Sequence, residues 1–320
     1  MNNASTTPLV TIITPAYNQG RYLAETIESV LSQDYPAVEY IVIDDGSTDT
    51  TPEVIERYAG RLTAIRQENQ GQARTINRGV DLAQGKYVGY LSSDDVLYPQ
   101  AISRLVDALE ADPSVVCAFP DANLIDASSQ IVKHNVCRPF DLTALIVEQE
   151  CYIGPGALYR IAAARQVGGW KPQLKLGPDR EFWMRLARFG EFHFLPEELG
   201  GYRLHTGSTS YANFSEAVSR EFLGVLDAYF AEPDPDPEAL ARKDEAYGHA
   251  NFVIVRNCIR GGEFGRALHY YQEARRLDPS LGSLYNMYIL LRTASSKPIR
   301  LALSWLSALK SNRQSASGRI

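Results

Sequence analysis

Residues 10–49 read VTIITPAYNQGRYLAETIESVLSQDYPAVEYIVIDDGSTD and contain two β-rich runs separated by one helical pattern. The runs at 10–14 and 39–44 are rich in Val and Ile, whereas 21–32 repeats apolar residues at helical spacing. The alternation continues, with strands predicted at 62–66, 87–91 and 115–119 and helices predicted at 50–58, 72–83 and 99–110. This order predicts an α/β fold with a Rossmann-like, mostly parallel sheet that helices cover on both faces.

Polar residues follow three of the predicted strands at the point where each strand ends. They read TPAYN at 14–18, DDGSTD at 44–49 and SSDD at 92–95. Ligands of open α/β sheets bind outside the carboxyl ends of the strands. We therefore expect the three loops to meet at one edge of the sheet and to form a ligand site there.

A second pattern begins at residue 121 and mixes strands with a helix. Strands are predicted near 122–126 and 201–205, and a helix is predicted at 179–189. We interpret residues 1–212 as one domain, with a first half of about 1–120 and a second half of about 121–212.

Residues 213–320 are predicted to form a helical C-terminal region. The Pro-rich run at 232–237 predicts a turn, and 260–279 resembles a single tetratricopeptide-type helix, fewer than the roughly three repeats that an array needs. From Pro279 to the C-terminus there are six Lys or Arg residues and no Asp or Glu. Such a basic, apolar tail either contacts an anionic membrane surface or packs on the catalytic domain, and both interpretations stay open.

The composition limits the possible classes of protein. The 320 residues carry a formal charge of −6, which argues against a protein that coats nucleic acid. The four cysteines form no CxxC pair, so neither a zinc site nor a disulfide framework is predicted. The N-terminus lacks the features of a secretory signal, and no stretch is apolar enough to span a membrane. We expect a cytoplasmic protein, soluble or peripheral at the inner face of the membrane.

Asp94 and Asp95 follow an apolar strand, where carboxylates are costly unless they are paired, hydrated or bound to a cation. A divalent ion, Mn²⁺ or Mg²⁺, held between these carboxylates and a diphosphate would explain them, and would act as a Lewis acid on a diphosphate leaving group. Helix capping before Pro99 is the alternative. Likewise, 44–49 is either a turn with a helix cap or a loop whose first carboxylates contact a nucleotide.

Taken together and in order, the motifs resemble the family 2 glycosyltransferases of the GT-A fold. The resemblance covers about residues 9–210. The first motifs are ITPAYN at 13–18, DDGSTD at 44–49, QGQ at 70–72, NRG at 77–79, GKY at 85–87 and SSDD at 92–95. The later ones are GGW at 168–170, DREFWMRLA at 179–187, and YRLH at 202–205 with Ser208 and Ser210.

The resemblance implies an inverting, metal-dependent glycosyltransferase of the hexosyltransferase type. Residues 1–212 would be the catalytic domain, with a nucleotide-sugar half at about 1–120 and an acceptor half at about 121–212. The enzyme's donor would be a nucleotide-diphosphate sugar, with a uridine diphosphate sugar expected first. Its acceptor would be a saccharide or a lipid-linked molecule, in the biosynthesis of a surface or exported polysaccharide. The base, the sugar and the acceptor are not fixed by the motifs.

The resemblance also implies roles for individual residues. The metal would be held by Asp95 and His205. The family's DxDD motif begins with Asp where this chain has Ser92, so one carboxylate is missing. It is open which of Asp44 and Asp45 contacts the base. Nucleotide and donor contacts are implied for Thr14, Pro15, Tyr17, Asp44, Asp45, Asn77, Asp94 and Arg203.

Asp179 matches the family's catalytic base. A base accepts the proton of the acceptor hydroxyl while the oxygen attacks opposite the departing diphosphate, which predicts a single displacement with inversion. Capping of the helix at 180–189 is the alternative role for Asp179. Trp170 either stacks on an acceptor sugar or packs in the core. Arg203 either contacts the diphosphate or is solvated.

Three other classes of protein compete with this interpretation. A dinucleotide-dependent oxidoreductase needs GxGxxG after the first strand, and residues 15–20 do not supply it. A sugar nucleotidyltransferase needs a Gly-rich basic first loop, which is absent. A non-catalytic nucleotide-sugar-binding or scaffold protein is the remaining alternative, and the presence of Asp95, Asp179 and His205 together argues against it.

Overall fold

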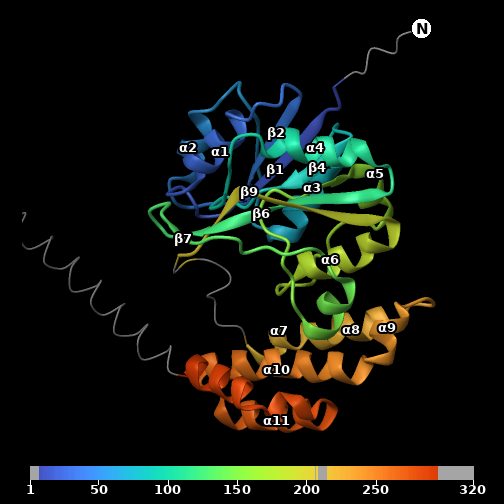
Figure 1. The fold of residues 1–320 in the computed structure, drawn as a ribbon. Coiled ribbons are helices and arrows are strands. Elements are labelled where there is room, and N and C mark those ends of the chain that lie inside the picture. The colour runs from blue at the N-terminus through green and yellow to red at the C-terminus, as the bar shows by residue number, and fades with distance from the viewer. Residues whose placement is uncertain (1–6, 206, 208–214, 295–320) are drawn as a thin grey trace, which may run out of the picture. The chain divides into compact units, whose positions relative to one another are not determined.

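The computed structural model describes residues 7–205, 207 and 215–294. The chain divides into two compact units. The first consists of Met1–Leu145 and Glu150–Ala212, and the second of Ile146–Gln149 and Asn213–Ile320. Figure 1 labels the α-helices of both units and most strands of the first unit.

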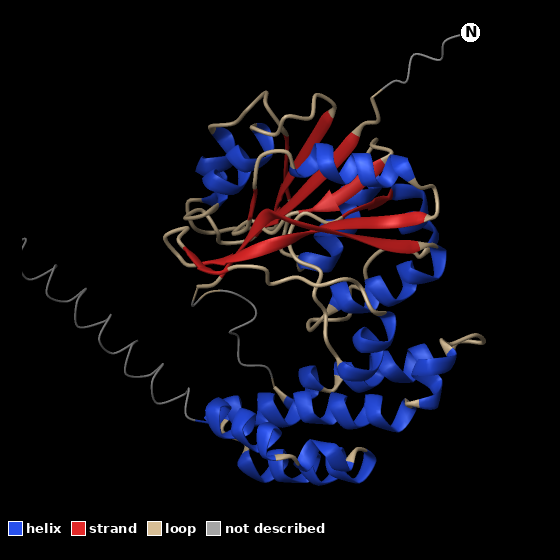
Figure 2. Cartoon of the chain, viewed as in Figure 1, coloured by secondary structure: helices blue, strands red, loops and turns tan. Residues whose placement is uncertain are grey.

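One nine-stranded sheet runs through the first unit, in the order β3-β2-β1-β4-β8-β6-β9-β5 with β7 on β6 (Figure 2). The pairs β1–β2, β2–β3, β1–β4 and β6–β9 are parallel, whereas β5, β7 and β8 add antiparallel pairs. The strands are β1 (Val10–Ala16), β2 (Val38–Asp44), β3 (Thr63–Arg66), β4 (Tyr87–Tyr90), β5 (Val96–Leu97), β6 (Val115–Ile125), β7 (Ile131–Lys133), β8 (Leu158–Arg160) and β9 (Glu191–Arg203). The predicted α/β fold is confirmed, with a parallel first half and a mixed second half.

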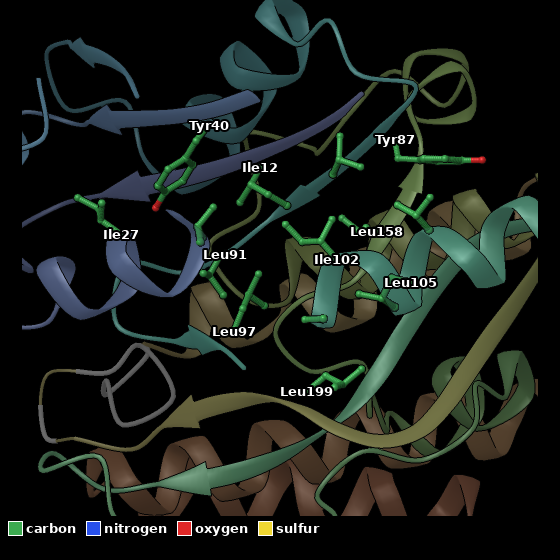
Figure 3. Packing of buried hydrophobic residues seen from close by; sticks show 14 of the residues in the cluster. Ile12, Ile27, Tyr40, Tyr87, Leu91, Leu97, Ile102, Leu105, Leu158 and Leu199 are labelled. Atoms are coloured by element: carbon green, nitrogen blue, oxygen red, sulfur yellow. The ribbon is translucent and has the colours of Figure 1, made fainter. Parts of the chain in front are cut away.

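Helices pack on the two faces of this sheet because successive strand residues point to opposite sides. Ile12 belongs to a buried cluster with Ile27 of α1 and Ile102 of α4 (Figure 3). On the other side, a Cβ at Gly79 of α3 would lie 2.5 Å from the side chain of Ile13, so glycine allows this helix to approach β1 closely. The helices of the unit are α1 (Leu23–Leu31), α2 (Thr51–Glu56), α3 (Gln72–Leu82), α4 (Ala101–Ala111), α5 (Ile161–Gln166) and α6 (Pro178–Leu186), with the short turn η2 (Ala187–Phe189). The short turn η1 (Ala144–Glu148) includes residues of both units.

The second half of the sheet differs from the sequence prediction in its strand lengths. The runs predicted at 115–119 and 122–126 form one strand, β6, whose pairing with β9 shifts in register between Pro120 and Ala122. The strand predicted at 201–205 begins earlier, at Glu191. Because strand pairing tolerates such irregularities, β6 continues through the segment around Asp121, where the sequence pattern predicted the end of a strand.

The described part of the second unit is helical, as expected. Its helices are α7 (Glu216–Ser219), α8 (Glu221–Phe230), α9 (Pro237–Ala241), α10 (Lys243–Gly261) and α11 (Phe264–Leu277), followed by the turn η4 (Pro279–Gly282) and a further helix over 284–294. Ile254, Val255 and Cys258 of α10 pack against Ala267 and Tyr270 of α11. Over 7–205, 207 and 215–294, no helix has the length and apolar character that crossing a bilayer requires.

Candidate active site

The loops after β1 and β2 are hydrogen-bonded into one rim. β1 and β2 run in register, with Ala16 opposite Asp44. The N–H of Asn18 donates to Ser47 Oγ (2.9 Å), and Asn18 Oδ1 accepts from the N–H of Thr48 (2.8 Å). The N–H of Gly20 donates to Asp49 Oδ2 (3.0 Å). The two loops that were expected to meet are therefore adjacent, and each holds the other.

The structure distinguishes the two leading carboxylates of the second loop. Asp45 accepts from the N–H groups of Gln70 (2.9 Å) and Gly71 (2.8 Å) and from Gln67 Nε2 (2.7 Å). Asp44 accepts from the N–H of Ser47 through Oδ1 (2.9 Å). Its buried Oδ2 accepts no hydrogen bond from the residues that the structure describes, although Arg66 Nε lies 3.3 Å away. Asp44 thus has an acceptor left for a ligand, whereas Asp45 holds the 67–71 loop.

The three predicted contacts of the first loop differ in where their side chains lie. Thr14 Oγ1 shares a hydrogen bond with the buried Tyr40 Oη (3.0 Å), so it points into the core. Pro15 is buried in β1 as well. The ring of Tyr17 is 49% exposed and is available for stacking on a base. Contacts of Thr14 and Pro15 with a nucleotide would have to involve the backbone.

Asp94 and Asp95, in the loop after β4, lie near His205, which follows β9. His205 Nε2 lies 2.9 Å from Asp94 Oδ2, and the His205 ring packs on Tyr22 with centroids 4.6 Å apart. The side chain of Asp95 is buried, and its Oδ1 accepts from the N–H of Arg203 (2.8 Å). Burial, and then the negative charge of Asp94, raise the pKa of Asp95 well above its usual value. Of the two residues predicted to bind the cation, His205 contacts Asp94, which precedes Asp95 in the chain.

This donor set fits a divalent cation only in part. In the chain as described, no three carboxylate, imidazole or thiolate groups already converge on one point. Mg²⁺ and similar ions keep several waters and take phosphate oxygens as ligands, so one or two protein carboxylates suffice. A cation would also offset the repulsion between Asp94 and Asp95, which adds to burial in raising the pKa of Asp95.

Helix capping was the alternative role for Asp94 and Asp95 and for Asp179, and neither version matches the structure. Helix α4 has Gln100 as its N-cap, not Asp94 or Asp95. Helix α6 has Gly177 as its N-cap, with φ 61°, so Asp179 lies inside the first turn. Asp49, by contrast, accepts from the N–H of Thr51 (2.9 Å) and does hold the start of α2.

Asp179 is a partly buried carboxylate at the start of α6. Burial raises its pKa, although backbone N–H groups and the charge of Arg180 oppose the rise. A raised pKa makes a carboxylate a stronger base. Such a group can take up a proton from a nearby hydroxyl, while the adjacent arginine and the backbone N–H groups favour its ionised form beforehand.

Tyr90, the last residue of β4, connects the two halves of the site. Burial, and then the acidic groups of Asp179, Cys151 and Asp95 in that order, raise the pKa of Tyr90. The phenol of Tyr90 is thus influenced by acidic groups from both halves of the site. The sequence interpretation missed Tyr90 because it reads as an ordinary strand residue; its place two residues before SSDD was the available signal.

Asn77 and Trp170 contact each other rather than an open surface. Asn77 Nδ2 donates to Trp170 O (2.8 Å), and its Oδ1 accepts from the N–H of Trp170 (2.7 Å). The Trp170 ring is 2% exposed and packs edge-on against Tyr90, with centroids 4.8 Å apart. These contacts favour the packing interpretation for Trp170, and the acceptor and donor roles of both residues stay predictions.

Comparison with known proteins finds relatives of this chain among glycosyltransferases. The family model described as Glycosyl transferase family 2 matches residues 11–168. An uncharacterized glycosyltransferase of Rickettsia prowazekii is 29% identical over 68% of this chain and 70% of its own length. The chondroitin synthase of Escherichia coli is 30% identical over 69% of this chain, but the match spans only 32% of that synthase.

Two solved structures share the fold at low sequence identity. Staphylococcus aureus TarS 1-349 in complex with UDP-GlcNAc has a TM-score of 0.63 and 17% identity, over 85% of this chain and 91% of that one. The mannosyltransferase PcManGT of Pyrobaculum calidifontis, in complex with GDP-Man and Mn²⁺, has a TM-score of 0.60 and 19% identity, over 95% of this chain and 84% of that one.

Proposed function

We propose, from the premise that this chain belongs to glycosyl transferase family 2, that it moves a sugar from a nucleotide-diphosphate sugar to an acceptor hydroxyl with inversion. The observation that carries the proposal is the gathering of His205 with the Asp94–Asp95 turn, where His205 Nε2 lies 2.9 Å from Asp94 Oδ2. Such a group suits a cation that stabilises a departing diphosphate, and Asp179 would be the base that accepts the proton of the attacking hydroxyl.

On the donor side, the exposed ring of Tyr17 would stack on the base, and Asp44 Oδ2 would accept a hydrogen bond from it. Asp94, Asp95 and His205 would hold Mn²⁺ or Mg²⁺ against the diphosphate. When bound, the cation would supply Lewis-acid stabilisation of the leaving group. Thr14 and Pro15 would contribute backbone contacts, and Asn77 would shape the site through Trp170.

On the acceptor side, Asp179 would accept the proton of the attacking hydroxyl. The burial that raises the pKa of Asp179 strengthens the carboxylate as a base for this proton. Positive charge on Arg180 would keep the carboxylate ionised before the reaction. A single displacement needs no carboxylate nucleophile.

The nature of the substrates is a further part of the proposal. The TarS structure contains UDP-GlcNAc and the PcManGT structure contains GDP-Man with Mn²⁺, which supports a nucleoside diphosphate with a metal as the ligand class. We expect a uridine diphosphate sugar. The chondroitin synthase relative supports a polysaccharide or its precursor as the product.

The test is a thermal-shift panel of UDP, GDP and ADP with and without Mn²⁺. We expect UDP to stabilise the protein, more strongly with Mn²⁺. Asp95→Ala should remove the Mn²⁺-dependent part, whereas Asp81→Ala, an exposed carboxylate on α3, should keep it. Survival of the Mn²⁺-dependent shift in Asp95→Ala would place the metal elsewhere. A thermal shift with a nucleoside diphosphate, in a protein that transfers no sugar, would favour the non-catalytic alternative.

We also propose that the C-terminal region contacts an anionic membrane. Leu284, Tyr285, Tyr288 and Leu291 are exposed, and 284, 288 and 291 recur on one side of the 284–294 helix. The stretch after residue 279 carries only basic charges, although its part from 295 onward lies outside the described residues. Apolar and basic side chains together suit the surface of an anionic bilayer.

Vesicle sedimentation tests this contact. The protein should pellet with vesicles that contain phosphatidylglycerol and not with pure phosphatidylcholine, and added salt should release it. Leu284→Ser with Leu291→Ser should weaken pelleting, whereas Leu240→Ser, an exposed leucine of α9, should not. Self-association without vesicle binding would show instead that a second copy covers this surface.

A further inference from the structure

Arg203, the last residue of β9, has a guanidinium surrounded by protein groups. The residue is 1% exposed. Its Nη1 donates to Asp126 O (3.1 Å) and Ser129 Oγ (2.8 Å), and its Nη2 donates to Glu25 Oε2 (2.8 Å). Its Cζ lies 5.0 Å from the ring centroid of Tyr22. An arginine held by so many fixed groups has a single defined position.

From this position Arg203 holds the turn at Asp94 and Asp95. Its Nε donates to Asp94 O (2.6 Å), and its backbone N–H donates to Asp95 Oδ1 (2.8 Å). Helix α1 holds the same turn from another side, because Thr26 Oγ1 donates to Asp95 O (2.7 Å). Two consecutive residues of α1 thus act on the turn, Thr26 directly and Glu25 through Arg203.

We infer that Arg203 is a positioning residue for the Asp94–Asp95 turn, and that Glu25 holds Arg203 in place for this task. The inference rests on the proposed cation site. It differs from the diphosphate contact that the sequence implied for Arg203, because Nε and both Nη atoms donate to protein oxygens. Arg203 acts on the donor through Asp94 and Asp95.

The physical reason for such a support is the repulsion between neighbouring carboxylates. Asp94 and Asp95 bring two negative charges to one short turn, one of them buried. A turn held only by its own backbone could relieve the repulsion by rotating one carboxylate away from the site. Partners that orient a ligating carboxylate typically change metal affinity by about 10- to 100-fold.

Glu25→Gln tests the inference, because it keeps the size of the side chain and removes the charge that faces Arg203. Glu28→Gln is the matched control, since Glu28 is one turn along α1 and also pairs with an arginine, Arg61, at 3.5 Å in solvent. Arg203→Lys is a second variant that keeps the charge and loses the planar donor geometry. The measurement is the Mn²⁺ concentration that gives half of the Mn²⁺-dependent UDP binding, with GDP as the probe if the wild type prefers it.

Glu25→Gln and Arg203→Lys should raise this Mn²⁺ concentration about tenfold or more. UDP binding without Mn²⁺ should stay unchanged, and Glu28→Gln should match the wild type throughout. Equal Mn²⁺ requirements for Glu25→Gln and Glu28→Gln would overturn the inference. Equal weakening of UDP binding with and without Mn²⁺ in Arg203→Lys would also overturn it, because it would indicate direct contact with the diphosphate. Absence of Mn²⁺-dependent binding in the wild type would instead defeat the proposed function itself.

Discussion

The two sides of the site treat their carboxylates in opposite ways. On the nucleotide side, burial of Asp49 is outweighed by hydrogen bonds from Thr51 and Gly20, so its pKa is lowered. On the cation side, burial and the charge of Asp94 dominate, so the pKa of Asp95 is raised. The protein thus satisfies Asp49 with its own N–H groups, whereas Asp95 is only partly compensated and would gain from the positive charge of a bound cation.

Replacement of Asp179 should have the largest effect. Asp179→Asn keeps the shape of the side chain and removes the base, so kcat should fall by about 10²- to 10⁴-fold. Binding of the nucleoside diphosphate should change little, because Asp179 belongs to the acceptor side. Steady-state kinetics with calorimetric binding would check both quantities. Equal losses in nucleotide binding and in kcat would indicate that Asp179 is a structural residue. The site would then not divide into a nucleotide side and an acceptor side as described.

The two carboxylates of the nucleotide side should respond differently to amidation. In Asp45→Asn the new NH₂ group must face an N–H donor, because both oxygens already accept hydrogen bonds. This should cost about 1–3 kcal/mol of unfolding free energy. In Asp44→Asn the NH₂ can take the place of Oδ2, which accepts no hydrogen bond and loses only its ion pair with the largely exposed Arg66. The loss of stability should therefore be smaller, about 0.2–1 kcal/mol, while UDP affinity falls about tenfold. Urea unfolding and calorimetry separate these outcomes, and the reverse pattern would exchange the two roles.

The smallest effect should be a gain in stability on the cation side. A raised pKa means that the folded protein binds this proton more tightly than the unfolded chain does. Stability from Asp95 is therefore greatest once the group is protonated, and it is lost as the pH rises through the folded pKa. At neutral pH without metal, Asp95→Asn should raise the melting temperature, by about 2–4 °C per kcal/mol gained. A lower melting temperature would mean that the fold already compensates the carboxylate.

The sequence predicted the elements of this site better than the directions of its side chains. Asp94, Asp95 and His205 were expected together and are neighbours, because strand ends and motif order locate backbone positions. Thr14 was expected at the rim and points instead toward Tyr40, since its direction depends on which face of β1 it occupies. Arg203 and Asn77 were expected to contact the donor, and their partners are groups far away in sequence that no local pattern reveals.

The mutual hydrogen bonds of Asn18, Ser47 and Thr48 have a practical consequence for engineering. A chimera that exchanges only residues 44–49 with those of a relative would lose partners contributed by the loop after β1. Transplanting base preference between relatives should therefore require both segments to move as one cassette, together with Asn18 itself.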